Sequence, residues 1–212
     1  MTGDGWPLEP DRQLQGVTES VVATLGPNDR WNLAALGLRA GEASARDGRV
    51  TARTWGRTRT RRNFERRGGG VVQFVRDPVV FVDAALGIAE RAHPVDDSAD
   101  AWVEVRVERL AESDTGTDGD SGETDAQQGT TWVDWALDPR SGTVERRGVR
   151  TINRGFNAVV EATVWASRLS VEAYDEAELR DRLAFLAEVV EASGTERDRM
   201  AFERIGSYVD WR

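Results

Sequence analysis

Positive charge and hydrogen-bonding side chains are concentrated in one short segment, Arg53–Asn63. Its sequence, RTWGRTRTRRN, alternates arginines with threonine hydroxyls and ends in an amide. The segment lies where a predicted strand ends and a predicted helix begins, and the first turn of a helix favours an anion. Thr58, Thr60 and Asn63 could add neutral hydrogen bonds, and arginine makes bidentate contacts with phosphate oxygens. These residues predict a cradle for one phosphate ester.

Two other interpretations of this segment remain open. The arginines could form a solvated basic surface, or they could form a patch that binds nucleic acid. Binding of nucleic acid through counterion release weakens steeply as salt rises, whereas a compact cradle depends more on geometry. We therefore favour the cradle and expect no nucleic-acid partner.

The whole chain is acidic, which sets this basic segment apart. The net charge is −9, from 37 acidic and 28 basic residues, and every basic residue is an arginine. An acidic surface stays solvated where salt screens the repulsion between like charges, so we predict a halophilic protein. A genome rich in G and C would explain the arginines but not the acidity.

Composition excludes several classes of site. The chain has no Cys, which excludes disulfides, zinc–thiolate sites and a cysteine nucleophile. The single histidine, His93, excludes a multi-histidine metal site and is expected in an exposed loop, so no metal is predicted. No motif assigns a catalytic residue. The sequence shows no secretory leader, and the apolar stretch 79–89 is too short for a membrane span. We expect a cytoplasmic protein without a membrane partner.

Patterning predicts a mainly β fold followed by helices. Short strands separated by turn signals are expected at 20–25, 31–38, 49–55, 71–75, 101–110 and 131–137, with a short helix at 60–67. They favour an antiparallel sheet or small barrel over residues 1–150. Helical periodicity then predicts a C-terminal extension over residues 151–212. The segment 112–128 contains no basic residue and almost no apolar one, and is expected to be a mobile acidic loop.

Several motifs in order resemble one protein family. They are GRTRTRRN at 56–63, VVQFVRDP at 71–78, PNDRWNLAALG at 27–37, AAL at 84–86, AWVE at 101–104 and RGFNAVVE at 154–161. Together they resemble an archaeal domain-of-unknown-function family with an FMN-binding split barrel, distantly related to flavin reductase-like proteins. The resemblance covers nearly the whole chain except the acidic segment 112–128.

The resemblance implies a fold, a cofactor and a partner. The fold is an antiparallel FMN-binding split β-barrel of six or seven strands with a C-terminal helical extension. The chain would form a homodimer with FMN near the subunit interface. Leu36 and Gln73 depart from residues that are frequent in the family at these places.

The resemblance also implies the residues that bind FMN. The phosphate would be held by Thr58, Thr60 and Asn63, helped by Arg53 or Arg59, with Thr54 in the same site. The backbone of Asn32, Leu33, Ala34 and Ala35 would run along the isoalloxazine ring. The residue types agree with this, because a strand of small side chains lets backbone groups approach a flat heterocycle. Tight packing within the sheet is the other explanation for those small residues.

Three functions stay open at this point. The first is a flavin-dependent oxidoreductase whose substrate the sequence does not assign. The second is a non-catalytic flavin-binding carrier or sensor module. The third is an oxidoreductase that binds a deazaflavin in the same barrel. The sequence names neither the substrate nor the electron donor, because the cofactor carries the chemistry.

Overall fold

The computed structural model describes residues 2–3, 5–8, 14, 16–40, 49–113, 131–148 and 151–212. These residues form two compact units. The first contains the described parts of 1–76, 89–121 and 129–147, and the second contains 77–88 and the described parts of 148–212. The predicted domain boundary between residues 150 and 151 stays a prediction.

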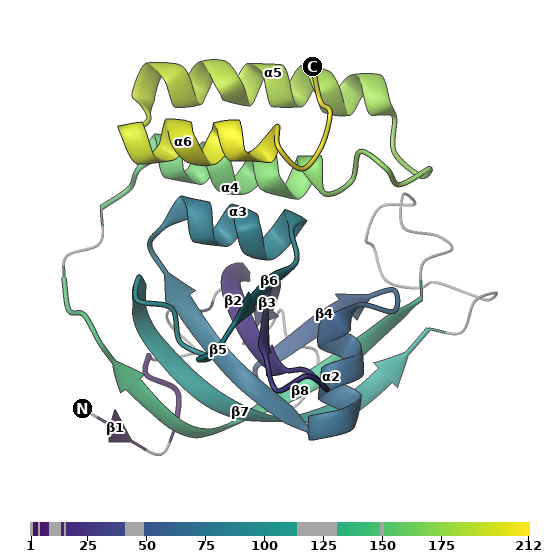
Figure 1. Cartoon of the computed structure of the whole chain (residues 1–212), viewed down its shortest axis with the longest axis vertical. Coiled ribbons are helices and arrows are strands. Elements are labelled where there is room, and N and C mark those ends of the chain that lie inside the picture. Colours follow the sequence, from purple (N-terminus) through teal and green to yellow (C-terminus); the bar gives the residue numbers. More distant parts are fainter. Residues whose placement is uncertain are drawn as a thin grey trace. The chain divides into compact units, whose positions relative to one another are not determined.

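Six of the described strands close into an antiparallel barrel in the first unit (Figure 1). They are β2 (Val17–Leu25), β3 (Trp31–Arg39), β4 (Thr51–Trp55), β5 (Gly69–Val75), β7 (Ala99–Glu112) and β8 (Trp132–Val144). Their order is β8-β4-β3-β2-β5-β7, and pairing of β7 with β8 closes the ring. Two short strands lie outside this ring: β1 (Thr2–Gly3) pairs with β8, and β6 (Ala89–Arg91) pairs with β3. The expected antiparallel barrel is confirmed.

Alternating side chains fill the barrel. On β7, Val103, Val105 and Val107 are buried while the residues between them are exposed, as the period of two in the sequence predicts. The same core contains Leu36 from β3 and Trp135 from β8. The interior is thus a packed apolar core, and a ligand must bind at an edge or an opening.

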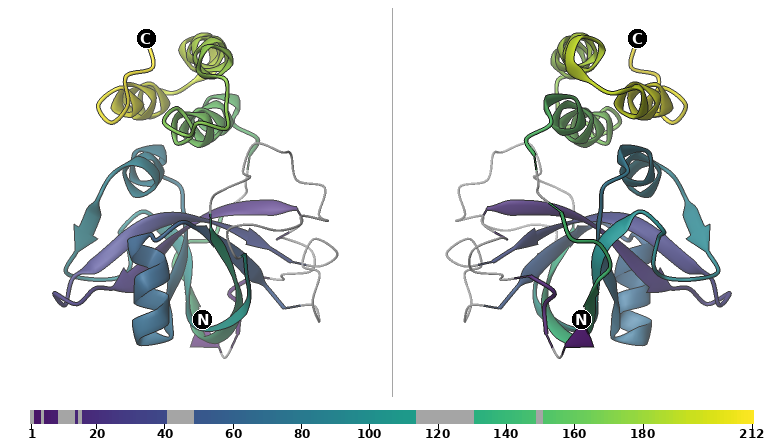
Figure 2. Two further views of the ribbon diagram at one scale, coloured as in Figure 1. Left: turned by 90° about the vertical axis from the view of Figure 1, so that its right-hand side faces the viewer. Right: turned by 90° about the vertical axis from the view of Figure 1, so that its left-hand side faces the viewer.

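One short helix, α2 (Arg59–Arg67), connects β4 to β5 and lies along the outside of the barrel (Figure 2). Thr58 caps its start by accepting a hydrogen bond from the Arg61 N–H at 3.2 Å. Gly68 ends it in the left-handed conformation, with φ of 70°. Phe64 anchors the helix to the barrel core, with its ring centroid 5.3 Å from that of Trp135.

Helices form the second unit. They are α3 (Pro78–Leu86), α4 (Arg154–Ala166), α5 (Glu176–Ser193) and α6 (Glu196–Ile205). Helices α4, α5 and α6 share a core that includes Val159, Leu183 and Ile205, and α3 packs against α4 and α6. The predicted C-terminal helical extension is confirmed, and α3 joins it from an earlier part of the chain.

Some expectations fall outside the described residues. Of the predicted acidic loop at 112–128, only Glu112, the last residue of β7, and Ser113 are described. His93 lies in an exposed loop, as predicted. Across the described ranges, no helix has the length and apolarity to cross a bilayer, and no group of three or more His, Cys, Asp or Glu side chains is placed to hold a metal ion.

Candidate functional site

The barrel is split between β3 and β4. These strands pair only where residues 38–39 of β3 meet residues 51–52 of β4. At the other end of β3, residues 31–33 pair with β6. Residues 34–37 therefore have no strand partner on this side among the described residues, and the split is a gap in the ladder.

The hairpin between β2 and β3 determines which backbone groups face the split. The Gly26 N–H donates to the Arg30 carbonyl at 2.8 Å, so Gly26 and Arg30 form a hydrogen-bonded pair. This pair determines which of the following pairs along β2 and β3 are hydrogen-bonded. Because hydrogen bonds alternate sides along an antiparallel strand, the even-numbered residues of β3 bond to β2 and the odd-numbered ones face away. Ala35 and Gly37 thus direct their N–H and C=O groups into the split. Within the described part of the chain these groups have no hydrogen-bond partner.

The edge of β4 that faces the split presents backbone groups that match those of β3. The Gly56 N–H donates to the Thr131 carbonyl at 2.6 Å, so the odd-numbered residues of β4 face β3. If β3 and β4 continued to pair in the same register, Gly37 would pair with Arg53 and Ala35 with Trp55. Neither pair forms. A planar ligand that enters the split would therefore meet backbone donors and acceptors.

The first two turns of α2 lie beside Asn32 of β3. The Arg59 guanidinium pairs with Glu90 at 2.7 Å, and Glu90 is the register partner of Asn32 on β6. The Asn63 amide donates to the Thr24 hydroxyl at 3.0 Å, and Thr24 is the partner of Asn32 on β2. The structure thus brings together three of the predicted site residues, Asn32, Arg59 and Asn63.

The start of α2 offers groups that an anion could satisfy. Thr60 is only 5% exposed, and its hydroxyl makes no hydrogen bond to any described residue. The backbone N–H groups of Arg59 and Thr60 belong to the first turn, where a helix has no internal acceptor. No acidic side chain lies in this turn. Thr58 is exposed and already caps the helix.

Two other predicted residues are engaged within the barrel wall. The Arg53 guanidinium makes a two-pronged ion pair with Asp134, at 2.7 and 3.1 Å, and stacks 4.0 Å from the ring centroid of Trp132. The Thr54 hydroxyl lies in the interior and accepts a hydrogen bond from the Trp135 indole at 2.9 Å. The structure does not place Thr54 with the polar groups of α2, and a role for it in cofactor binding stays a prediction.

The four predicted ring-side residues of β3 differ in what they expose. Leu33 is 2% exposed, and Ala34 packs against the barrel core. The backbone groups of Asn32 and Ala34 bond to β2. Of the four residues, Ala35 is therefore the one whose backbone faces the split. Sequence reasoning did not assign Gly37 or Trp55 to the site.

A closed ring of ion pairs ties α2 to β7. Arg61 bonds to Glu65 at 3.2 Å and to Glu112, while Arg109 bonds to Glu112 at 2.8 Å and to Glu65 at 2.6 Å. Burial by itself would lower the pKa of Arg61, but the hydrogen bonds and charges of Glu65 and Glu112 outweigh burial and raise that pKa. The ring holds the first turn of α2 against the barrel.

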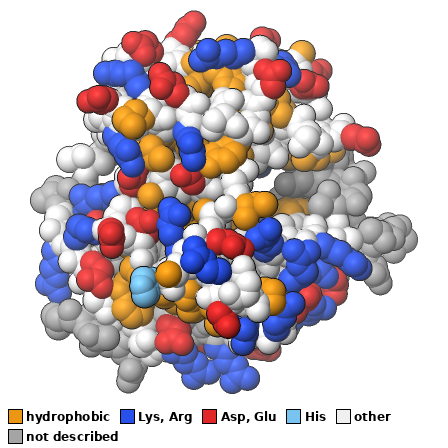
Figure 3. Space-filling model, in the orientation of Figure 1, with side chains coloured by type: hydrophobic (Ala, Val, Ile, Leu, Met, Phe, Trp, Pro, Cys, Tyr) orange, Lys and Arg blue, Asp and Glu red, His pale blue; other side chains and the backbone are white. Residues whose placement is uncertain are grey.

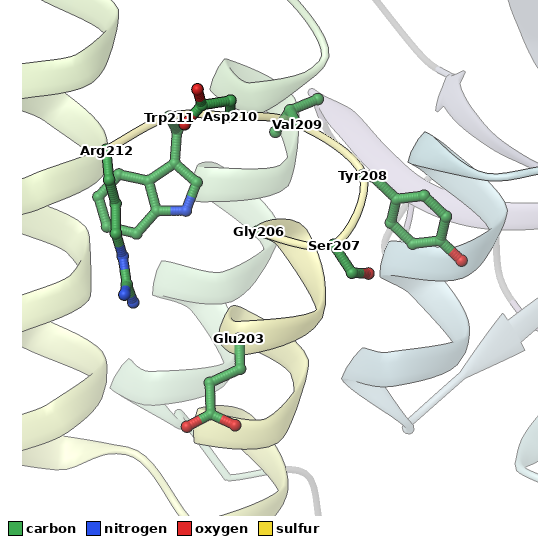
Figure 4. A pocket seen from close by; sticks show the side chains of 8 residues that line it. All are labelled: Glu203, Gly206, Ser207, Tyr208, Val209, Asp210, Trp211 and Arg212. Carbon is green, nitrogen blue, oxygen red and sulfur yellow. The ribbon is translucent and has the colours of Figure 1, made fainter.

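A separate shallow hollow lies in the second unit, at the end of α6 (Figure 4). It is lined by Glu203 and by residues 206–212. Tyr208 points from it toward α3 and donates a hydrogen bond to Asp83 at 2.8 Å. None of the predicted site residues lies there.

The fold defines the chain as a split-barrel protein with a helical extension. Residues 18–146 match the model for the N-terminal domain of DUF447, and residues 153–207 match a second DUF447 model, both described as protein of unknown function. The chain belongs to the DUF447 family. The expected family resemblance is thereby confirmed.

Two solved structures are similar to the chain. An FMN-bound DUF447 protein from Methanosarcina mazei shares 21% identity, with a TM-score of 0.72 over 92% of this chain and 96% of that chain. A homologue of nitrilotriacetate monooxygenase component B from Mycobacterium thermoresistibile gives 16% identity over 65% of this chain and 75% of that chain, with a TM-score of 0.36. No curated protein sequence matches the chain. The first comparison establishes the fold.

Proposed function

We propose that this protein binds FMN at the split of its barrel and acts as a flavin-dependent oxidoreductase. The observation that carries the proposal is the pair of strand edges whose backbone groups face the split, next to a helix start that suits an anion. The FMN-bound relative from Methanosarcina mazei has the same fold over nearly its whole length and supports this choice of ligand.

The strand edge fits the ring of a flavin. The pyrimidine side of the isoalloxazine ring carries a hydrogen-bond donor between acceptors, and the backbone of Ala35 and Gly37 provides both kinds of partner. Both residues have small side chains, which allows a flat ring to approach the strand closely. In this proposal the edge of the ring bonds to the backbone of β3, where hydrogen bonds from β4 are missing.

The start of α2 fits the phosphate of the same molecule. The N–H groups of Arg59 and Thr60 and the hydroxyls of Thr58 and Thr60 are neutral donors at the positive end of a helix dipole. Asn63 has one amide hydrogen bond engaged with Thr24, so it serves at least in part to hold the helix in place. The positive charge of Arg59 also attracts the phosphate in this proposal, and its ion pair with Glu90 partly offsets that attraction.

When bound, a flavin supplies hydride and electron transfer at its ring, and the protein supplies binding and orientation. No side chain is assigned as an acid or base. A carrier or sensor that binds FMN without turnover is the alternative, and a deazaflavin is the alternative ligand. The homodimer, the cytoplasmic location and adaptation to salt stay predictions.

The test begins with the protein as purified. We expect a flavin absorption spectrum and release of FMN on denaturation, identified by mass. A protein that is colourless and does not bind added FMN would contradict the proposal, and a deazaflavin mass would correct the ligand. Bleaching of bound FMN by NADH or NADPH, followed by repeated reoxidation, would establish turnover. A single stoichiometric reduction across a panel of acceptors would favour the carrier or sensor.

A further inference from the structure

Helix α2 and the residue just before its cap present a row of exposed arginines without acidic partners among the described residues. Arg57, Arg62 and Arg66 are exposed, and none of them forms an ion pair with any residue that the structure describes. Their neighbours Arg59 and Arg61 are paired with glutamates. Figure 3 shows arginine side chains gathered where Figure 1 draws α2. In a chain of net charge −9, this is a local concentration of positive charge.

Positive charge at the start of α2 works against the stability of the helix. Cations near a helix start oppose the dipole, at a cost of about 0.3–1 kcal/mol each at exposed positions. The start of α5, in contrast, carries Glu176 and Glu178, and that of α6 carries Glu196 and Asp198, as the dipole favours. Arg66 lies in the last turn of α2, where the dipole favours a cation, so this cost applies only to the arginines at the helix start.

The arginines exceed what one phosphate needs. The proposed FMN phosphate is served by the backbone N–H groups and threonines of the first turn. Arg62 and Arg66 continue from Arg59 along the same side of the helix, at spacings of three and four residues. Arg62 also donates to the carbonyl of Arg57 at 3.2 Å, which holds Arg62 beside the helix start. A second anionic group therefore has its own partners, about one turn further along the helix.

We infer that Arg57, Arg62 and Arg66 bind the phosphate groups of a nucleotide cosubstrate of the flavin. Arginine suits phosphate because its planar fork makes bidentate hydrogen bonds. The placement of this nucleotide beside the ring rests on the proposed function, while the anion-binding row itself does not.

A small nucleotide fits the charges better than a long nucleic acid does. The acidic chain as a whole repels a polyanion, and Glu65 and Glu90 lie beside the row. A nucleotide with two or three phosphates meets only the local positive potential. A nucleic acid needs a longer basic track to release enough counterions.

The test uses NADP⁺ and NAD⁺ as probes, because the oxidised forms bind without turnover. Binding to the FMN-loaded protein is measured by calorimetry at fixed salt, for the parent chain and for the variants R62A and R62A/R66A. Loss of each charge-assisted contact is expected to weaken binding about tenfold. The matched control is R106A, which removes an exposed arginine of β7. The Kd for FMN is measured in every variant and is expected to stay unchanged.

The outcomes distinguish failure of this inference from failure of the proposed function. Equal nucleotide binding in the parent chain and in R62A/R66A overturns the inference, as does the absence of nucleotide binding to the FMN-loaded chain. An equal loss in R106A also overturns it, because the effect would then be one of net charge. Binding of single-stranded RNA that is lost in R62A/R66A, without nucleotide binding, would make the row a nucleic-acid surface instead. A chain that does not bind FMN contradicts the proposed function, and calorimetry with that chain still tests the row.

Discussion

The side-chain amide of Asn63 donates to the hydroxyl of Thr24 across 3.0 Å, and this hydrogen bond joins helix α2 to strand β2 of the barrel. Both residues are buried. Thr24 is in turn the strand partner of Asn32, so the bond fixes the helix start relative to the strand whose edge faces the split. Asn63 is therefore a positioning residue in this structure, in addition to its predicted contact with phosphate.

Replacing Thr24 by Val tests these two roles of Asn63. The change removes the acceptor and is expected to lower the free energy of unfolding by about 1 kcal/mol, as for one net hydrogen bond. Asn63→Ala is expected to cost a similar amount of stability but to weaken FMN binding more. Denaturant unfolding and FMN titration of both variants give the comparison. An equal loss of FMN affinity in the two would assign Asn63 to positioning alone.

Replacing Thr60 by Val separates ligand binding from folding. The Thr60 hydroxyl has no hydrogen-bond partner in the described part of the chain, so stability is expected to change little. The loss of one contact with phosphate is expected to weaken FMN binding about tenfold. Thr58→Ala is expected to differ from Thr60→Val, because loss of the cap costs about 1 kcal/mol of stability in addition to a contact with phosphate. Unchanged FMN affinity in Thr60→Val would place the phosphate elsewhere.

Proline at neighbouring positions of β3 tests the split. Ala35→Pro removes an N–H that faces the split, so the β2–β3 ladder stays complete and FMN binding is expected to weaken. Ala34→Pro removes an N–H that bonds to β2 and leaves its acceptor without a partner, so it is expected to destabilise the barrel by about 1–3 kcal/mol. Thermal unfolding and FMN titration distinguish the two. Equal destabilisation by both substitutions would mean that Ala34 and Ala35 do not differ in which of them bonds to β2.

The second unit provides a pH test at Tyr208. Burial raises the pKa of the Tyr208 phenol, and the hydrogen bond and charge of Asp83 raise it further against the opposing charge of Arg204. The folded state therefore holds this proton to a higher pH than the unfolded chain does. The stabilisation is complete below the ordinary pKa of about 10 and is lost as the pH rises through the folded value.

Ultraviolet titration of the phenol measures this shift directly. The chain has two tyrosines, so Tyr174→Phe leaves Tyr208 as the only one. Its midpoint is expected above the ordinary value, and adding Asp83→Asn is expected to bring it down, because the acceptor charge is then gone. A midpoint at the ordinary value in Tyr174→Phe would contradict the buried contact with Asp83.

Much of the fold could be predicted from local patterns. The alternating valines of β7 defined a strand with one buried face, and Asp175 and Thr195, which cap α5 and α6, are residue types typical of helix starts. The resemblance to the family implied the antiparallel split barrel. These features depend on residues close together in the chain, where the periodicity of apolar side chains and the chemistry of caps act directly.

The composition of the candidate site was also visible in the sequence, as the run of arginines, threonines and Asn63. The tertiary structure alone decided how these residues are used, because each use depends on a partner far away in the chain. Arg53 is held by Asp134, Thr54 by Trp135 and Arg59 by Glu90. The sequence by itself thus determined which groups could bind an anion. Which backbone groups face the split depended on the register of three strands, which forms only when the barrel closes.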